Sequence, residues 1–236
     1  MRSDSSLWVV ILAGGEGRRL ASATRDAAGA HVPKQFCRFG GDASLLSRTL
    51  DRARRLADSE RIIVVVQEAH RRWWELELRS LPPDNIIAQA ANRGTGVALL
   101  HAVAMIHARD REACILMLPS DQGVQNEHAW HATLCRAAEA ASGAPEHVVL
   151  VGAEPQSDPD FGWIVPGERT ENGTHTVLGF AEKPGAAEAD RLARTGALCS
   201  TFVFAASTTT LLDLFGRHAS EQIAGYALSV SGSAVG

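Results

Sequence analysis

A glycine-rich turn directly after the first apolar run holds the residues best suited to bind an anion. Residues 8–12 form a short apolar run that predicts a buried strand, and Gly14, Gly15 and Gly17 follow it. Glycines let a backbone approach an anion closely and turn several N–H groups toward it. Arg19 and Lys34 come next and could neutralise a polyphosphate. The sequence therefore predicts a phosphate site at the end of this strand.

Three known patterns could explain such a turn. The Walker pattern is excluded because no Gly-Lys-Ser/Thr closes the loop. The dinucleotide fingerprint is excluded because the glycine spacing is not G-x-G-x-x-G and no acidic residue ends a second strand near position 35. A tight strand-to-helix turn with solvated arginines stays open, since one glycine turn is a weak signal.

The elements that must position these residues follow from hydrophobic periodicity. We expect strands at 8–12, 61–66, 85–88, 113–118, 147–152, 174–181 and 200–205, and helices at 44–58, 68–79, 94–109, 127–142 and 186–195. Strands that alternate with helices imply a mainly parallel sheet with helices on both faces. The predicted fold class is therefore α/β, a Rossmann-like three-layer αβα sandwich with a mixed, mainly parallel sheet.

A carboxylate is expected beside the glycine-rich turn. Ligands of open α/β sheets bind at the carboxyl ends of the strands. Asp121 follows strand 113–118 after a Pro-Ser pair, just as the glycines follow strand 8–12. A carboxylate in that place could hold Mg²⁺, which prefers oxygen ligands. The alternative is that Asp121 caps a helix N-terminus.

Composition limits the class of protein. The chain has 236 residues, enough for one large α/β domain or two small ones. Its net charge of -4 argues against a general nucleic-acid binder. No stretch approaches the ~20 apolar residues of a membrane span. The four widely spaced cysteines form no C-x-x-C pair, so we expect reduced thiols in a cytoplasmic protein.

The order of the motifs resembles that of the sugar-1-phosphate nucleotidyltransferases. The glycine-rich turn is followed by Pro-Lys-Gln-Phe at 33–36, the form most similar to mannose-1-phosphate guanylyltransferases. Further matching segments lie at 89–96, 119–121, 161–164 and 180–184. Each is weak alone, but their shared order is specific. The resemblance implies the nucleotidyltransferase fold and the transfer of a nucleotide to a hexose 1-phosphate, with pyrophosphate as the leaving group.

The resemblance also implies roles for named residues. Arg19 would stabilise the departing pyrophosphate, Lys34 would contact the phosphates at the reacting centre, and Asp121 would hold Mg²⁺. The implied nucleotide-binding residues are Leu12, Ala13, Gly14, Gly15, Gly17, Gln89, Asn92, Arg93, Gly94 and Thr95. Those implied for the sugar phosphate are Gly162, Glu182, Lys183 and Cys199. Arg93 as a plain surface charge and 182–184 as a solvated turn stay open as alternatives.

Two departures from the family's pattern affect the expected activity. Cys199 stands where the family has an asparagine that contacts the sugar, and a thiol cannot supply an amide's paired donor and acceptor. The family's second metal-binding aspartate, in a Trp-x-Asp-x-Gly setting, has no counterpart in this sequence. We expect binding of a nucleoside triphosphate, with GTP favoured, and slow turnover. A related enzyme with a different base, or a truncated or diverged regulatory homologue, stays open.

The domain expectation follows from the same resemblance. We expect a single domain over 1–225, with a nucleotide-binding half at 1–152 and a sugar-binding part at 153–225. Residues 226–236 are small and polar and are expected to form a disordered tail. Whether the chain forms a homo-oligomer is left open by the sequence.

Overall fold

A computed structural model describes residues 6–17, 24–25, 29–155, 160–220 and 223 of the chain. Arg19 and the expected tail at 226–236 lie outside the described residues. The predictions made for them therefore stay predictions.

The described strands form one mixed sheet whose first half is parallel. The order is β3-β2-β1-β4-β8-β6-β7, with β5 also paired to β8. The parallel strands are β1 (Leu7–Leu12), β2 (Ile62–Gln67), β3 (Ile86–Gln89) and β4 (Cys114–Pro119). The antiparallel part contains β5 (Val149–Ala153), β6 (Gly162–Arg169), β7 (His175–Glu182) and β8 (Leu198–Ser207). The predicted α/β class with a mixed sheet is confirmed, and the parallel strands form the half that carries the glycine-rich turn.

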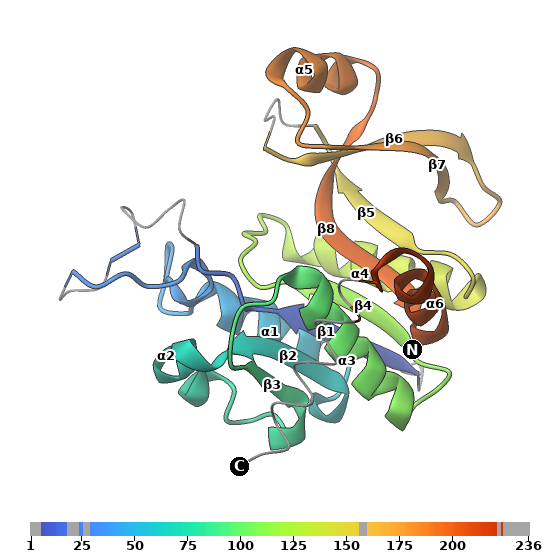
Figure 1. Cartoon of the computed structure of the whole chain (residues 1–236). Coiled ribbons are helices and arrows are strands. Elements are labelled where there is room, and N and C mark those ends of the chain that lie inside the picture. The colour runs from blue at the N-terminus through green and yellow to red at the C-terminus, as the bar shows by residue number, and fades with distance from the viewer. Residues whose placement is uncertain (1–5, 18–23, 26–28, 156–159, 221–222, 224–236) are drawn as a thin grey trace.

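Helices cover both faces of the parallel half (Figure 1). Side chains alternate along β1, so Val9 and Ile11 face one core cluster, while Trp8 and Val10 face the other. The first cluster takes apolar residues from α1 (Leu45–Arg54), α2 (Arg71–Glu77) and α4 (Glu127–Gly143). The second takes them from α3 (Thr95–Arg109) and α6 (Thr208–His218). These are the three layers that the alternating pattern predicts.

The β6–β7 hairpin and α5 (Ala186–Arg194) extend beyond the three-layer body (Figure 1). They have a small core of their own, in which Trp163, Leu192 and Cys199 are buried. The long strand β8 joins the two parts, because its end at 204–207 pairs with β4 and its start at 198–199 pairs with β6. One sheet therefore runs through both parts, and the domain limits drawn from the sequence stay a prediction.

Some elements differ from the sequence-based expectation. The helix expected over 68–79 is a 3₁₀ turn at Glu68–His70 followed by the shorter α2. Strand β6 and helix α6 were not predicted. Three consecutive threonines open α6, and β-branched residues disfavour helices. The helix is supported instead by Leu211, which packs in the second cluster, and by the Ser207 hydroxyl, which accepts a hydrogen bond from the Thr210 N–H at 3.1 Å.

Candidate active site

A pocket lies across the carboxyl ends of the parallel strands. It encloses about 340 Å³, within the range of roughly 300–1,000 Å³ typical of small-molecule sites. Many residues predicted to bind nucleotide and phosphate line it together. The lining consists of Leu12, Gly14, Gly15, Gly17, Lys34, Gln35, Val65, Gln89, Asn92, Gly94, Thr95, Ala98, Pro119, Ser120, Asp121 and Phe202.

The side-chain amides of two buried glutamines donate hydrogen bonds to backbone carbonyls of the glycine-rich turn. The Gln35 Nε2 donates to the carbonyls of Ala13 at 2.9 Å and Gly15 at 2.8 Å. The Gln67 Nε2 donates to the carbonyl of Gly14, which lies between them. Both glutamines are buried, with 3% and 6% exposure. Three successive carbonyls are thus turned toward the protein interior.

These hydrogen bonds also fix the direction of the backbone N–H groups of the turn. In a trans peptide the N–H points away from the carbonyl of the same unit. The N–H groups of Gly14, Gly15 and Glu16 are therefore directed away from the two glutamines. A Cβ built on Gly15 would meet no described atom within 4 Å, and one on Gly14 would meet only ordinary contacts. The turn thus presents backbone donors and open space, the arrangement that binds anions.

Gly17 has a different reason for being a glycine. Its φ is +63°, in the left-handed region that favours glycine, and an added Cβ would lie 3.0 Å from the Lys34 backbone nitrogen. The turn therefore packs directly against the Pro-Lys-Gln-Phe segment. This contact explains why the two motifs occur together, since one segment supplies both the supporting Gln35 and the cation Lys34.

Lys34 and Asp121 form an ion pair inside the pocket. The Lys34 Nζ lies 3.1 Å from the Asp121 Oδ2, with the two side chains 34% and 41% exposed. Asp121 does not cap a helix, because α4 begins after Asn126, whose side chain accepts a hydrogen bond from the Ala129 N–H. The capping alternative is therefore wrong, and the carboxylate is available at the pocket wall.

A second ion pair supports the loop that carries Asp121. Arg52 on α1 donates from Nε and Nη2 to the Glu127 carboxylate of α4, with a shortest distance of 2.8 Å. Its Nη1 donates to the Gln122 carbonyl at 3.1 Å. The Arg52 hydrogen bonds lower the pKa of Glu127 below its ordinary value. Gln122 in turn donates from Nε2 to the Thr201 carbonyl of β8.

The far end of the pocket lies at the start of α3. Gln89 ends β3, Gly94 is the N-cap of α3 with φ +86°, and Thr95 is the first helical residue. Gly94 and Thr95 line the pocket and no described side chain caps this helix start, so the positive end of the helix dipole lies at the pocket. The Asn92 Oδ1 accepts a hydrogen bond from the Gly94 N–H at 2.9 Å.

Two predicted nucleotide residues do not line the pocket. Arg93 is exposed, in keeping with the surface-charge alternative. Ala13 is fully buried, and its N–H donates to the Val65 carbonyl. Ala13 thus fixes the end of β1, and its role toward a ligand stays a prediction.

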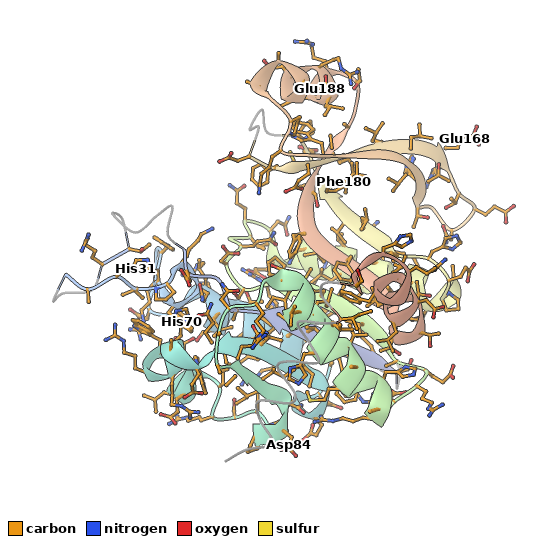
Figure 2. All side chains as sticks on the ribbon, in the orientation of Figure 1. His31, His70, Asp84, Glu168, Phe180 and Glu188 are labelled. Atoms are coloured by element: carbon orange, nitrogen blue, oxygen red, sulfur yellow. The ribbon has the colours of Figure 1, made fainter. Side chains whose placement is uncertain are left out.

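The residues predicted for the sugar phosphate lie on the neighbouring strands β6 to β8. Gly162 pairs with Glu182 across the β6–β7 hairpin, where an added Cβ would lie 2.6 Å from Phe180 Cζ. Figure 2 labels Phe180 where the hairpin crosses β8. Glu182 and Lys183 are exposed and 3.4 Å apart, and Lys183 has φ +44°. Cys199 is buried and pairs with Trp163. None of the four residues lines the pocket, and their sugar contacts stay predictions.

The pocket fits a magnesium ion only in combination with a ligand. Asp121 is the one carboxylate among the lining residues, and the described residues contain no group of three His, Cys, Asp or Glu that could hold a metal. Mg²⁺ commonly binds through one or two carboxylates together with substrate phosphates and water. Asp121 beside a glycine-rich turn that is expected to bind phosphate matches that mode.

Several residues of the site were missed by sequence reasoning. Gln67 is the last residue of the buried strand β2 and lies at the same sheet edge, so its position could have pointed to it. Arg52 lies on the apolar face of an amphipathic helix, where a buried arginine signals a partner. Phe202 gave no signal, because aromatic residues are ordinary in strands.

Comparison with known proteins agrees with this geometry. The family model for nucleotidyl transferases matches residues 8–213. The chain belongs to this family. It is 31% identical over 180 residues to the mannose-1-phosphate guanylyltransferase RfbM of Salmonella typhimurium, covering 74% of this chain and 36% of RfbM. It is also 31% identical over 195 residues to the xanthan biosynthesis protein XanB of Xanthomonas campestris, covering 81% of this chain and 40% of XanB.

A solved structure supports the same assignment. The crystal structure of a mannose-1-phosphate geranyltransferase from Thermus thermophilus superposes with a TM-score of 0.82 and 28% identity, covering 96% of this chain and 65% of that one. The predicted resemblance to sugar-1-phosphate nucleotidyltransferases is thus confirmed. The chain spans about two fifths of the length of the curated relatives it matches. No described helix is long and apolar enough to cross a membrane.

Proposed function

We propose that this chain joins a nucleoside triphosphate, with GTP favoured, to a hexose 1-phosphate, forming a nucleotide sugar and pyrophosphate. The observation that carries the proposal is the order of chemical groups along one sheet edge. From β3 to β8 the pocket offers polar groups and a helix start, then the glycine-rich turn, then Lys34 with Asp121, and then Phe202. A nucleotide sugar has the same order of base and ribose, phosphates, and hexose.

The size of the site agrees with this order. Neighbouring strands lie about 4.8 Å apart, so β3 and β8 are separated by roughly 19 Å across four spacings. A ligand that fills the edge must therefore be long and must have its phosphates near the middle. The Gly14 and Gly15 donors lie there, at the end of β1.

The proposed transfer does not require a strong general base. The attacking oxygen of the hexose 1-phosphate is already anionic, so catalysis depends on alignment and on stabilising charge at the α-phosphorus. The glycine-rich turn would hold the β- and γ-phosphates, and Lys34 would bring the two reacting phosphates together. Asp121 would hold Mg²⁺ against the α-phosphate, and the bound ion would neutralise charge during the transfer. Arg19 stays a candidate for stabilising the departing pyrophosphate.

A second candidate function is favoured by a specific observation. Asp121 is the one carboxylate among the described residues that line the pocket. One carboxylate would hold the cation loosely, which suits a protein that binds the nucleotide and turns it over slowly. The chain would then be a nucleotide-binding regulatory homologue. A different base in place of guanine belongs to the first candidate, and the predicted cytoplasmic location applies to both.

One assay separates these functions. Purified protein would be incubated with Mg²⁺, each of the four nucleoside triphosphates and several hexose 1-phosphates, while pyrophosphate release is followed. Release with one triphosphate and one sugar at ~10 per second, the median for enzymes, would support the transferase. Tight triphosphate binding with release slower by about 10²–10³ would favour the regulatory homologue. Neither binding nor release with any pair would overturn both.

A further inference from the structure

The strand β8 contains an irregularity that lies directly at the pocket. In the pairing with β5, Val151 lies opposite Val203, but the next residue, Gly152, lies opposite Ser200. Thr201 and Phe202 are thus extra residues that bulge from the ladder. Bulges next to active sites commonly redirect a side chain.

The bulge is held by specific hydrogen bonds. The Thr201 hydroxyl donates to the Val151 carbonyl at 2.6 Å, and the Thr201 carbonyl accepts a hydrogen bond from the Gln122 amide. The Phe202 N–H donates to the Ser200 hydroxyl at 3.3 Å. The bulge is therefore tied both to β5 and to the loop that carries Asp121.

Phe202 has a backbone conformation that its residue type disfavours. Its φ is +61°, and the only other described non-glycine residue with positive φ is Lys183. A bulky L-residue in this region is strained, and such strain is concentrated at functional sites. The side chain gains little burial in return, since Phe202 is 51% exposed. Packing within the protein therefore does not account for the conformation.

The position of the ring points to its ligand. Phe202 lines the pocket on the side of Pro119, Ser120 and Asp121, at the opposite end from Gln89 and the start of α3. Three residues earlier on β8, Cys199 pairs with Trp163, the neighbour of Gly162. Phe202 thus lies between the expected reacting centre and the part of the sheet expected to bind the sugar.

We propose that the Phe202 ring packs against the apolar face of the hexose of a bound hexose 1-phosphate and determines affinity for that substrate. This inference rests on the proposed transfer function. A hexose ring exposes C–H bonds on one face, and the face of an aromatic ring carries the negative part of its quadrupole. The bulge and its positive φ place the ring at the pocket while the rest of β8 keeps its pairing.

Three variants test the proposal. Phe202→Gly removes the ring and also relieves the positive φ, so the protein should be at least as stable as the wild type. Phe202→Tyr keeps the ring. Phe39→Ala is the matched control, because Phe39 is a 44% exposed ring that does not line the pocket. For each protein, KM for the hexose 1-phosphate and for the triphosphate would be measured, with mannose 1-phosphate and GTP tried first.

The hexose 1-phosphate would also be titrated calorimetrically with Mg²⁺ present, to read binding apart from turnover. We expect Phe202→Gly to raise both KM and Kd for the hexose 1-phosphate about tenfold, with KM for the triphosphate within twofold of the wild type. Phe202→Tyr and Phe39→Ala should match the wild type. A hexose 1-phosphate affinity unchanged in Phe202→Gly, or a rise confined to the triphosphate, would overturn the role of Phe202 and leave the transfer function standing. A wild type that binds no hexose 1-phosphate would overturn both.

Discussion

The Lys34 ammonium and the Asp121 carboxylate lie 3.1 Å apart, although they come from segments far apart in the sequence. Lys34 is held by the segment that packs against Gly17, and Asp121 follows β4, the strand next to β1. The ion pair holds one positive and one negative charge side by side at the wall of the pocket. A triphosphate with Mg²⁺ would offer each charge a new partner of opposite sign.

Substitution of Asp121 should affect the rate more than triphosphate affinity. Asp121→Asn keeps the shape but removes the charge that attracts a hard cation, so we expect kcat to fall by about 10²–10³. The Kd for the triphosphate should change by only a few-fold, because the glycine-rich turn is intact. Steady-state kinetics at saturating Mg²⁺, with calorimetric titration of the triphosphate, would measure both quantities.

Asp84→Asn is a suitable control for this change. Asp84 is exposed and precedes β3, at the end of the sheet opposite the pocket (Figure 2). Asp84→Asn should leave both kcat and the Kd for the triphosphate unchanged. If Asp121→Asn retains the kcat of the wild type, Asp121 is no metal ligand and its role is limited to pairing with Lys34.

We expect a bound triphosphate to occupy the open space beside Gly15. Gly15→Val places new atoms where no described atom lies within 4 Å of the Cβ, so the fold should tolerate it. We expect triphosphate binding to be lost and the melting temperature to stay within about 2 °C of the wild type. Gly216→Val on α6 is the control, since a Cβ added there also meets no described atom within 4 Å and Gly216 does not line the pocket. Unchanged triphosphate affinity in a folded Gly15→Val protein would exclude a phosphate role for the turn.

The sequence was sufficient to predict the parallel half of the fold. Its strands are short apolar runs bounded by turn residues, and β1, β2 and β4 are buried along nearly their whole length. The topology rule then places Gly14 and Asp121 at one edge from the sequence alone. Periodicity was equally reliable for α4, which was expected at 127–142 and runs from Glu127 to Gly143.

The antiparallel half was predicted less completely, because it is stabilised by contacts between segments that are far apart in the sequence. The sequence predicted β5, β7 and β8 but missed β6, which contains Pro166 at a shift in its register with β7. The strained φ of Phe202 could not be foreseen, since nothing in the residue type favours it. The hydrogen bonds of the Gln35 and Gln67 side-chain amides could not be foreseen either, because they depend on how three separate segments pack.

Gln35 should be needed for stability as well as for binding. Gln35→Leu would leave the carbonyls of Ala13 and Gly15 without their buried donor, at a cost of about 2 kcal/mol in the free energy of unfolding. Urea denaturation would measure this cost. Gln89→Leu, at the half-buried rim of the pocket, should change the unfolding free energy by no more than about 0.5 kcal/mol. Equal stability of the two variants would show that Gln35 does not support the turn.

The Arg52–Glu127 pair should give the protein a pH-dependent component of stability. Its hydrogen bonds to Arg52 lower the pKa of Glu127 from the ordinary value of 4.5. The pair therefore stabilises the fold fully above pH 4.5, where the carboxyl is ionised in both states, and this contribution is lost as the pH falls through the lower pKa of the folded state. Because the Glu127 side chain is 41% exposed, solvent screens the pair, and Glu127→Gln should cost about 1 kcal/mol at pH 7.

Denaturant titrations of the wild type and of Glu127→Gln at pH 7, 5, 4 and 3 would measure this contribution. The difference between the two proteins should be constant at pH 7 and 5 and should shrink at pH 4 and 3. Glu139→Gln is the control, because Glu139 lies on the same helix and is exposed. Its difference from the wild type should stay near zero at every pH. A Glu127→Gln difference that persists undiminished at pH 3 would mean that the loss comes from packing of the α4 start and not from the charge that Arg52 binds.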